Sequence, residues 1–132
     1  MIVVDSSAII AILFDEPEKQ AFQNTIDGEE RCFISAVNAH ETACILRGRL
    51  GVDAVIEFWR WLAENNVEIV PFDEVQVHAA AAAFHRYGKG IDPRARLNLS
   101  DCEALALART VGAPLLFKGN DFEATDVARP HP

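Results

Sequence analysis

Short apolar runs alternate with longer amphipathic segments along the whole chain. The short runs are rich in β-branched or aliphatic residues, and each is bounded by polar residues, Gly or Pro. Runs of this length and composition are typical of buried β-strands. We therefore predict four strands, at residues 2–4, 32–34, 67–70 and 114–117, and residues 125–127 are a candidate for a short edge strand.

The segments between these runs carry the signals of helix starts and stops. Ser7, Ser35 and Ser100 precede helical patterns as N-cap residues, and Gly28 and Gly51 follow them as stops. Residues 100–103 read Ser-Asp-Cys-Glu, which resembles a capping box. The predicted helices span residues 8–14, 17–28 (with Pro17 in the first turn), 36–49, 52–66, 74–87 and 101–111.

The segment 52–66 has the strongest helical periodicity. One stripe, which we interpret as the buried face, comprises Val52, Val55, Ile56, Trp59, Leu62 and Ala63. A second apolar stripe, formed by Ala54, Phe58 and Trp61, lies opposite the first. The pattern leaves open whether this second stripe also packs in the core or binds another chain.

Strands that alternate with helices indicate a parallel sheet covered on both faces. The predicted fold is therefore a three-layer α/β/α sandwich with a mainly parallel sheet of four to five strands. No linker, repeat or low-complexity tract interrupts the pattern, so we expect residues 1–132 to form a single domain. In such sheets ligands bind at the carboxyl ends of the strands.

Composition narrows the functional classes. The chain has 132 residues, no apolar run long enough for a membrane span, and no basic N-terminal segment typical of a secretory signal. Its three cysteines do not suggest a disulfide framework, so we expect a cytoplasmic protein. A net charge of −8 argues against non-specific nucleic-acid binding, which depends on Lys and Arg.

Four carboxylates stand at or near the predicted carboxyl edge of the sheet. Asp5 follows the first strand, Glu41 lies in the second turn of a helix, Asp101 begins another helix, and Asp121 follows the fourth strand. Each alone has an ordinary structural explanation, such as a helix-dipole or turn residue. Together they would repel strongly, since two like charges about 4 Å apart cost about 4 kcal/mol at an effective dielectric near 20.

Such a cluster must take up protons or bind hard cations. All-oxygen ligand sets favour Mg²⁺ or Mn²⁺, and Mg²⁺ held by few carboxylates keeps several waters. A metal-bound water can attack a phosphodiester while the metal charge stabilises the leaving oxygen. The four acids therefore predict metal-dependent cleavage of a phosphodiester.

Four segments containing these acids resemble the PIN-domain ribonucleases, and more narrowly the VapC toxins of bacterial and archaeal toxin–antitoxin pairs. The resemblance extends over the whole chain and includes Tyr-Gly-Lys-Gly at 87–90 and Thr-Asp at 125–126. The four segments are Ile-Val-Val-Asp-Ser-Ser-Ala (2–8), Ser-Ala-Val-Asn-Ala-His-Glu-Thr (35–42), Leu-Asn-Leu-Ser-Asp-Cys (97–102) and Pro-Leu-Leu-Phe-Lys-Gly-Asn-Asp-Phe (114–122).

The resemblance implies a Mg²⁺- or Mn²⁺-dependent endoribonuclease that cleaves transfer or ribosomal RNA. It also implies inhibition by a VapB-type antitoxin and assembly as a homodimer. The metal ligands and catalytic acids implied are Asp5, Glu41, Asp101 and Asp121, with Ser6 orienting Asp5 or a bound water. Two residues depart from the pattern: Asp92 replaces a frequent His, which could alter substrate contacts, and Ser100 replaces a frequent Gly.

Basic residues cluster in one segment of this acidic chain. Lys89, Arg94 and Arg96 fall close together, and Lys118 lies near the predicted site. We predict that these four residues, together with bound metal, contact the RNA. The ordinary alternative for each is a solvated surface charge.

Two other functional classes remain. A PIN scaffold without catalysis could bind RNA or protein, although the complete acidic set argues against it. A phospho-receiver signalling domain has a similar length and α/β pattern, but it requires an acidic pair after the first strand and an acceptor Asp ending the third. Both features are missing here.

Overall fold

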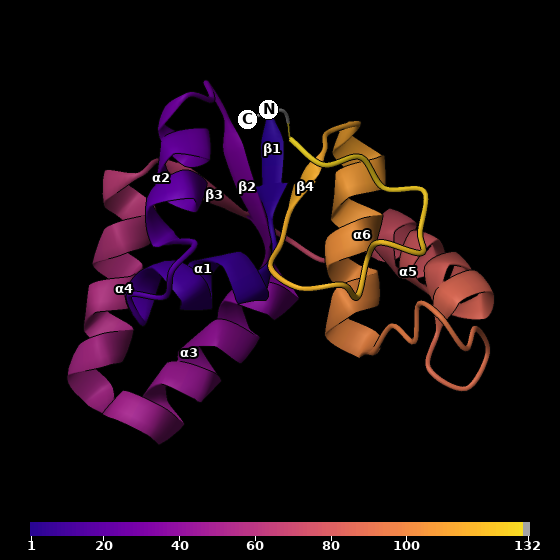
Figure 1. Ribbon diagram of the computed structural model, residues 1–132, viewed down its shortest axis with the longest axis horizontal. Coiled ribbons are helices and arrows are strands. Elements are labelled where there is room, and N and C mark those ends of the chain that lie inside the picture. The colour runs from indigo at the N-terminus through magenta and orange to yellow at the C-terminus, as the bar shows by residue number, and fades with distance from the viewer. Residues whose placement is uncertain (131–132) are drawn as a thin grey trace.

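A four-stranded parallel sheet forms the centre of the computed structural model, which describes residues 1–130 (Figure 1). Its strand order is β3-β2-β1-β4. All three strand pairings are parallel, so the predicted parallel sheet is confirmed. The strands are β1 (Ile2–Val4), β2 (Cys32–Ser35), β3 (Val67–Val70) and β4 (Leu115–Leu116).

Helices cover both faces of the sheet, as the strand–helix alternation predicts. Figure 1 shows α1 to α4 on one side and α5 and α6 on the other. Within residues 1–130, no helix is both long enough and apolar enough to cross a membrane. The helices are α1 (Ser6–Leu13), α2 (Lys19–Asp27), α3 (Ala36–Leu50), α4 (Val52–Glu64), α5 (Glu74–Tyr87) and α6 (Leu99–Val111).

The alternation of side chains along β1 divides the core into two halves. Ile2 and Val4 pack with residues of α1, α3 and α4, whereas Val3 packs with residues of α5 and α6. All three are fully buried, as expected for an inner strand of a sheet with helices on both faces. This packing fixes the register of β1 and therefore the position at which Asp5 leaves the sheet.

The face of α4 that is buried differs from the predicted one. Val52, Ile56 and Trp59 are exposed, whereas Phe58, from the second stripe, is fully buried. Leu62 is the member of the first stripe that is buried in the core. The sequence left the role of the second stripe open because both stripes have helical spacing, and only the docking of α4 on its neighbours selects the buried residues.

Several element boundaries also differ from the predictions. Asp5, not Ser7, is the N-cap of α1, and Asn98, not Ser100, is the N-cap of α6. Helix α2 begins two residues after Pro17. Residues 125–126 form a bend and Val127 has no regular structure, so the candidate edge strand is not formed, although Leu115 N donates to Ala128 O beside β4.

Other boundaries match the sequence signals. Ser35 caps α3 by accepting a hydrogen bond from Val37 N. Gly51 ends α3 with a φ of +93°, a backbone conformation that favours Gly. The chain therefore turns sharply there into α4.

Candidate active site

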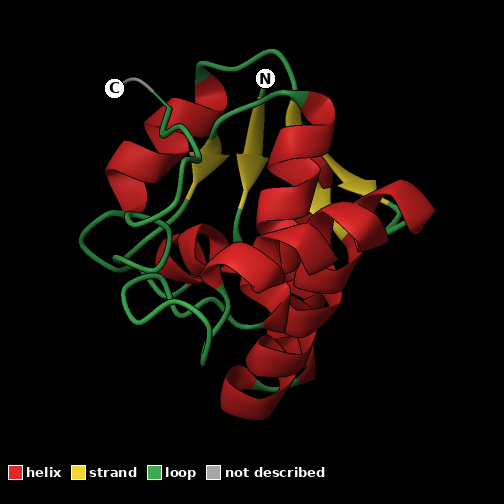
Figure 2. Cartoon of the chain, turned by 90° about the vertical axis from the view of Figure 1, so that its right-hand side faces the viewer, coloured by secondary structure: helices red, strands yellow, loops and turns green. Residues whose placement is uncertain are grey.

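The predicted acidic residues gather at the carboxyl edge of the sheet. Asp5 and Asp121 follow β1 and β4, while Glu41 lies on the helix that follows β2. Asp101 lies in the first turn of α6. Figure 1 shows α6 starting near the ends of the strands, and Figure 2 shows a group of loops below and to the left of the sheet. Parallel strands bring these distant segments together because their carboxyl ends share one edge.

Asp5 is a buried carboxylate held by the first turn of α1. Its side chain is almost completely buried, and Oδ2 accepts hydrogen bonds from Ser7 N at 3.0 Å and Ser7 Oγ at 2.5 Å. Burial raises the pKa of Asp5 to about 6, although the hydrogen bonds from Ser7 oppose that shift. The charges of Glu41 and Asp121 raise it further, so these acids act on Asp5 electrostatically.

Ser7, which the sequence analysis assigned to a helix cap, connects two parts of the site. Its hydroxyl donates to Asp5 and accepts a hydrogen bond from Lys118 N at 3.0 Å. Lys118 begins the turn that leads to Asp121. Ser6, predicted to orient Asp5, instead donates to Asn38 O at 3.3 Å. The hydrogen bonds to Asp5 thus come from Ser7 and not from Ser6, because successive residues of α1 point in different directions, and a role of Ser6 toward a bound water stays a prediction.

Asp101 is held by a reciprocal capping box. Asn98 N donates to Asp101 Oδ2 at 3.0 Å, and Asp101 N donates to Asn98 Oδ1 at 2.9 Å. Burial raises the pKa of Asp101 to about 7 against the lowering effect of the Asn98 hydrogen bond. Asp5, Asp121 and Glu41 each raise it further through their charges. The four predicted acids therefore interact as one electrostatic group.

Asn38 is a buried polar residue that the sequence analysis did not identify. Its side-chain amide donates to Ser100 O at 3.1 Å, next to Asp101, and its backbone oxygen accepts from Ser6. It thus joins α1, α3 and α6, which carry or follow three of the acids. The available sequence signal is its position one helical turn before Glu41, on the same face of α3.

Glu103 adds a fifth carboxylate beside Glu41. Its pKa is raised by burial and by the charge of Glu41. Its Oε2 atom is buried without a hydrogen-bond partner among the described residues. The sequence pattern indicates Glu103 only as part of a helix cap.

The residues present fit a hydrated hard cation. Within residues 1–130, none of Asp5, Glu41, Asp101 and Asp121 forms an ion pair with Lys, Arg or His. In the same part of the chain, no three His, Cys, Asp or Glu side chains form a ready-made ligand set. Mg²⁺ suits carboxylate side chains of this kind because it prefers oxygen ligands and retains water in several coordination positions. Oxygen donors also disfavour Zn²⁺.

Basic residues line the same hollow as two of the acids. A hollow of about 340 Å³ has Asp101 and Asp121 on its wall together with Lys89, Arg94 and Arg96. Lys118 does not line it. Its ammonium group pairs with Glu16 and Glu18 at 3.1 Å each, which raises the pKa of Lys118. The charge of Lys118 is therefore compensated by Glu16 and Glu18, and its contact with RNA stays a prediction.

The sequence of the chain matches the PIN domain family over residues 2–128. The chain belongs to the PIN domain family. It is 41% identical over 129 residues to Ribonuclease VapC of Mycolicibacterium smegmatis, covering 98% of this chain and 99% of the relative. It is 40% identical over 126 residues to Ribonuclease VapC30 of Mycobacterium tuberculosis, covering 96% of this chain and 95% of the relative. The predicted similarity to VapC proteins is thus confirmed.

Solved structures of other proteins share the fold. Mycobacterium tuberculosis VapC20, described as a toxin that cleaves the sarcin-ricin loop, aligns over 100% of both chains with a TM-score of 0.81 and 17% identity. A toxin–antitoxin complex from Klebsiella pneumoniae contains a chain with a TM-score of 0.73 and 16% identity, covering 99% of this chain and 98% of that one. These likenesses confirm the predicted α/β fold.

Proposed function

We propose that this PIN domain is a Mg²⁺-dependent endoribonuclease and the toxin of a VapBC-type toxin–antitoxin system. The observation that carries the proposal is the gathering of Asp5, Glu41, Asp101 and Asp121 at one edge of the sheet, where their charges raise the pKa values of Asp5 and Asp101. The names of the relatives support the same activity. Residues 1–132 are proposed to form one PIN domain.

The four acids would hold the cation, with Mn²⁺ as an alternative to Mg²⁺. When bound, the cation supplies a water activated for attack on phosphorus and positive charge for the leaving oxygen. Ser7 donates hydrogen bonds to one carboxylate oxygen of Asp5, and Asn98 N donates one to a carboxylate oxygen of Asp101. These hydrogen bonds fix the direction of the other oxygen of each carboxylate. The protein thus orients the ligands before RNA binds.

Three basic residues of the hollow would offset the net charge of −8 at the place where RNA binds. Lys89, Arg94 and Arg96 are exposed beside Asp101 and Asp121 in the same hollow. Phosphates on either side of the cleaved bond would contact these cations. The proposed RNA substrate is a transfer or ribosomal RNA. The proposal also includes inhibition by a VapB-type antitoxin, assembly as a homodimer and a cytoplasmic location.

Replacement of Asp101 tests the catalytic assignment. The wild-type protein should cleave RNA with Mg²⁺ or Mn²⁺ and not with EDTA. Asp101→Asn should lower the cleavage rate by at least about a hundredfold, because a metal ligand and its charge are lost. Asp53→Asn is the matched control. Asp53 is an exposed acid in the first turn of α4 and does not line the hollow that contains Asp101 and Asp121.

The outcome separates the nuclease from a non-catalytic scaffold. Cleavage that persists in EDTA, or that Asp101→Asn leaves at the wild-type rate, would contradict the proposed chemistry. RNA binding without any cleavage in Mg²⁺ or Mn²⁺ would favour the scaffold.

A further inference from the structure

The loop between α5 and α6, residues 88–97, is called the basic loop here because it carries Lys89, Arg94 and Arg96. We propose that Asp92 is a positioning residue that holds the basic loop in its RNA-contacting shape before RNA binds. This inference rests on the proposed function, since it assigns a role within the same RNA interface. It concerns the single acidic residue of the basic loop.

The carboxylate of Asp92 is used inside the loop. Its Oδ1 atom accepts hydrogen bonds from Arg94 N at 2.7 Å and Ala95 N at 3.2 Å. These two hydrogen bonds hold the pKa of Asp92 below its ordinary value, and the charge of Arg94 adds to the effect. An Asp that accepts backbone amides two and three residues ahead fixes a turn that the backbone alone would not hold.

The ends of the basic loop are also tied together. Lys89 N donates to Leu97 O at 2.8 Å, and Leu97 N donates to Tyr87 O at 2.9 Å. Inside the loop, Gly88 O accepts from Ile91 N at 2.9 Å and from Asp92 N at 3.0 Å. Asp92 therefore connects the half of the loop anchored on Gly88 with the half that carries the two arginines.

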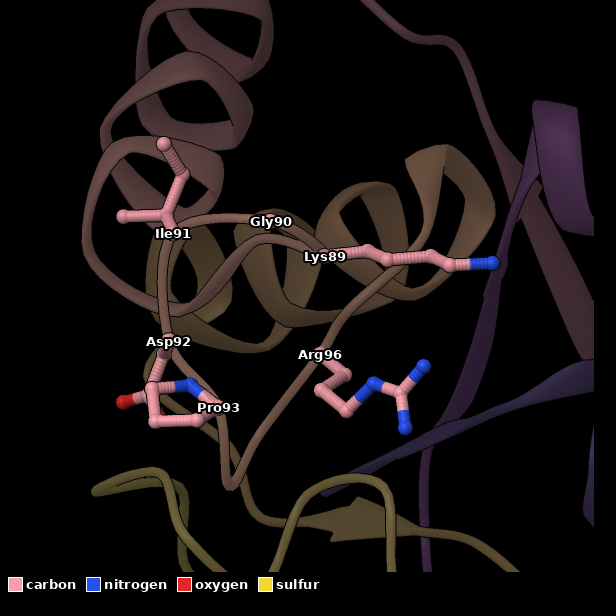
Figure 3. A pocket seen from close by; sticks show the side chains of 6 residues that line it. All are labelled: Lys89, Gly90, Ile91, Asp92, Pro93 and Arg96. Atoms are coloured by element: carbon pink, nitrogen blue, oxygen red, sulfur yellow. The ribbon is translucent and has the colours of Figure 1, made fainter.

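This frame sets the directions of the basic side chains. Ala95 is buried between the exposed Arg94 and Arg96. Arg96 has a φ of +54°, a left-handed conformation that a residue with a Cβ adopts only when its surroundings impose it. Figure 3 shows Lys89 and Arg96 extending toward the same side of the loop, with Asp92 on the other side. These two cations also line the hollow that contains Asp101 and Asp121.

Two opposite effects can be expected from an acid in an RNA-binding loop. As a free anion, Asp92 would repel phosphates, and its removal would strengthen RNA binding. As an internal hydrogen-bond acceptor, it removes the cost of ordering the loop upon binding, and its removal would weaken RNA binding. The hydrogen bonds that Asp92 accepts from Arg94 N and Ala95 N favour the second effect.

Asp92→Ala and Asp92→Asn separate these effects, because Asn keeps the acceptor oxygen and loses the charge. We would measure the binding of a labelled single-stranded oligouridylate by fluorescence anisotropy in EDTA, so that no metal-dependent cleavage occurs. Asp92→Ala should weaken binding by about fivefold or more, whereas Asp92→Asn should bind at least as tightly as the wild type. Asp53→Ala, which removes an exposed acid from α4, is the charge-matched control.

Two further readouts distinguish positioning from general destabilisation. Asp92→Ala should leave the affinity for Mn²⁺ unchanged, because none of the four proposed metal ligands belongs to the basic loop. In the RNA-free wild type, the Arg94 and Ala95 amides should be protected from hydrogen exchange. This second measurement needs no variant, and rapid exchange of both amides would overturn the preformed loop.

Tighter RNA binding by both Asp92→Ala and Asp92→Asn would show that Asp92 acts only as a repelling charge, and would overturn the inference. Equal weakening by both variants would also overturn it, because Asn retains the acceptor. Failure of the proposed function has a different signature, namely the lack of Mg²⁺- or Mn²⁺-dependent RNA cleavage by the wild type.

Discussion

The Ser7 hydroxyl donates a hydrogen bond to Asp5 Oδ2 at 2.5 Å and accepts one from Lys118 N at 3.0 Å. One side chain thereby links the end of β1 with the turn that follows β4 and leads to Asp121. A hydroxyl can do both because it has one proton and two lone pairs. The free oxygen of Asp5 and the position of Asp121 therefore depend on the same residue.

Ser7→Ala should weaken the binding of Mn²⁺ at neutral pH by about tenfold, through the loss of a hydrogen bond to a buried carboxylate. The pKa of Asp5 should rise above about 6, because both hydrogen bonds from Ser7 lower it and one is lost. The pH at which cleavage reaches half its maximum should move upward. Isothermal titration calorimetry and a pH–rate profile measure the two effects.

Ser7→Thr should retain most of the metal affinity, since it keeps the hydroxyl. Ser6→Ala is the matched control because the Ser6 hydroxyl bonds to Asn38 O and not to Asp5. Equal metal affinities for Ser7→Ala and the wild type would contradict the role given to Ser7.

Without metal, the protein should lose stability as the pH rises toward neutrality. Asp5 and Asp101 have folded pKa values of about 6 and about 7, above the ordinary value of 3.8. The folded state therefore binds protons more tightly than the unfolded state. The resulting stabilisation is fully present below pH 3.8 and is lost as the pH rises through about 6 and about 7.

Thermal unfolding in EDTA across this pH range measures the loss. Mn²⁺ or Mg²⁺ should raise the unfolding temperature at neutral pH, because the cation binds the folded state and neutralises the acids. Asp101→Asn should flatten the pH dependence in EDTA and raise the neutral-pH unfolding temperature by about 3 °C. A midpoint in EDTA that is constant or rises with pH through this range would contradict the predicted proton uptake.

The two basic regions near the site should respond differently to mutation. Arg94→Gln/Arg96→Gln should weaken RNA binding and reduce the slope of log K against log salt by about 1.4, at about 0.7 for each cation on a single strand. Lys118→Met should leave this slope unchanged, because Glu16 and Glu18 already pair with Lys118. Anisotropy titrations over a salt series test both expectations. A change of slope in the Lys118 variant equal to that of one arginine would place Lys118 in the interface.

The buried face of α4 can be tested by two substitutions within one helical turn. Phe58 is fully buried, whereas Ile56 is half exposed. Phe58→Ala should lower the free energy of unfolding by about 3–5 kcal/mol, because it leaves a cavity in the core. Ile56→Ala should lower it by less than about 1 kcal/mol. Urea unfolding of both variants measures the difference, and a larger loss for Ile56→Ala would contradict the observed orientation of α4.

Local sequence patterns were sufficient for the architecture and for the acids at the sheet edge. Buried strands that alternate with helices have few stable arrangements, and a parallel sheet places the residues after its strands at one edge. Asp5 and Asp121 could therefore be predicted from their positions after β1 and β4. The cap at Ser35 and the stop at Gly51 were equally readable, because capping involves only neighbouring residues.

Contacts between distant segments decided the remainder. The partners Ser7–Lys118 and Asn38–Ser100 are 111 and 62 residues apart, so no local pattern indicates them. The choice between the two stripes of α4 and the pairing of Lys118 with Glu16 and Glu18 likewise arise only when helices dock on the sheet. The sequence by itself determined which chemical groups are present and which edge they occupy. The tertiary structure decided which are buried, paired or free, because burial and hydrogen bonding depend on neighbours that only folding brings together.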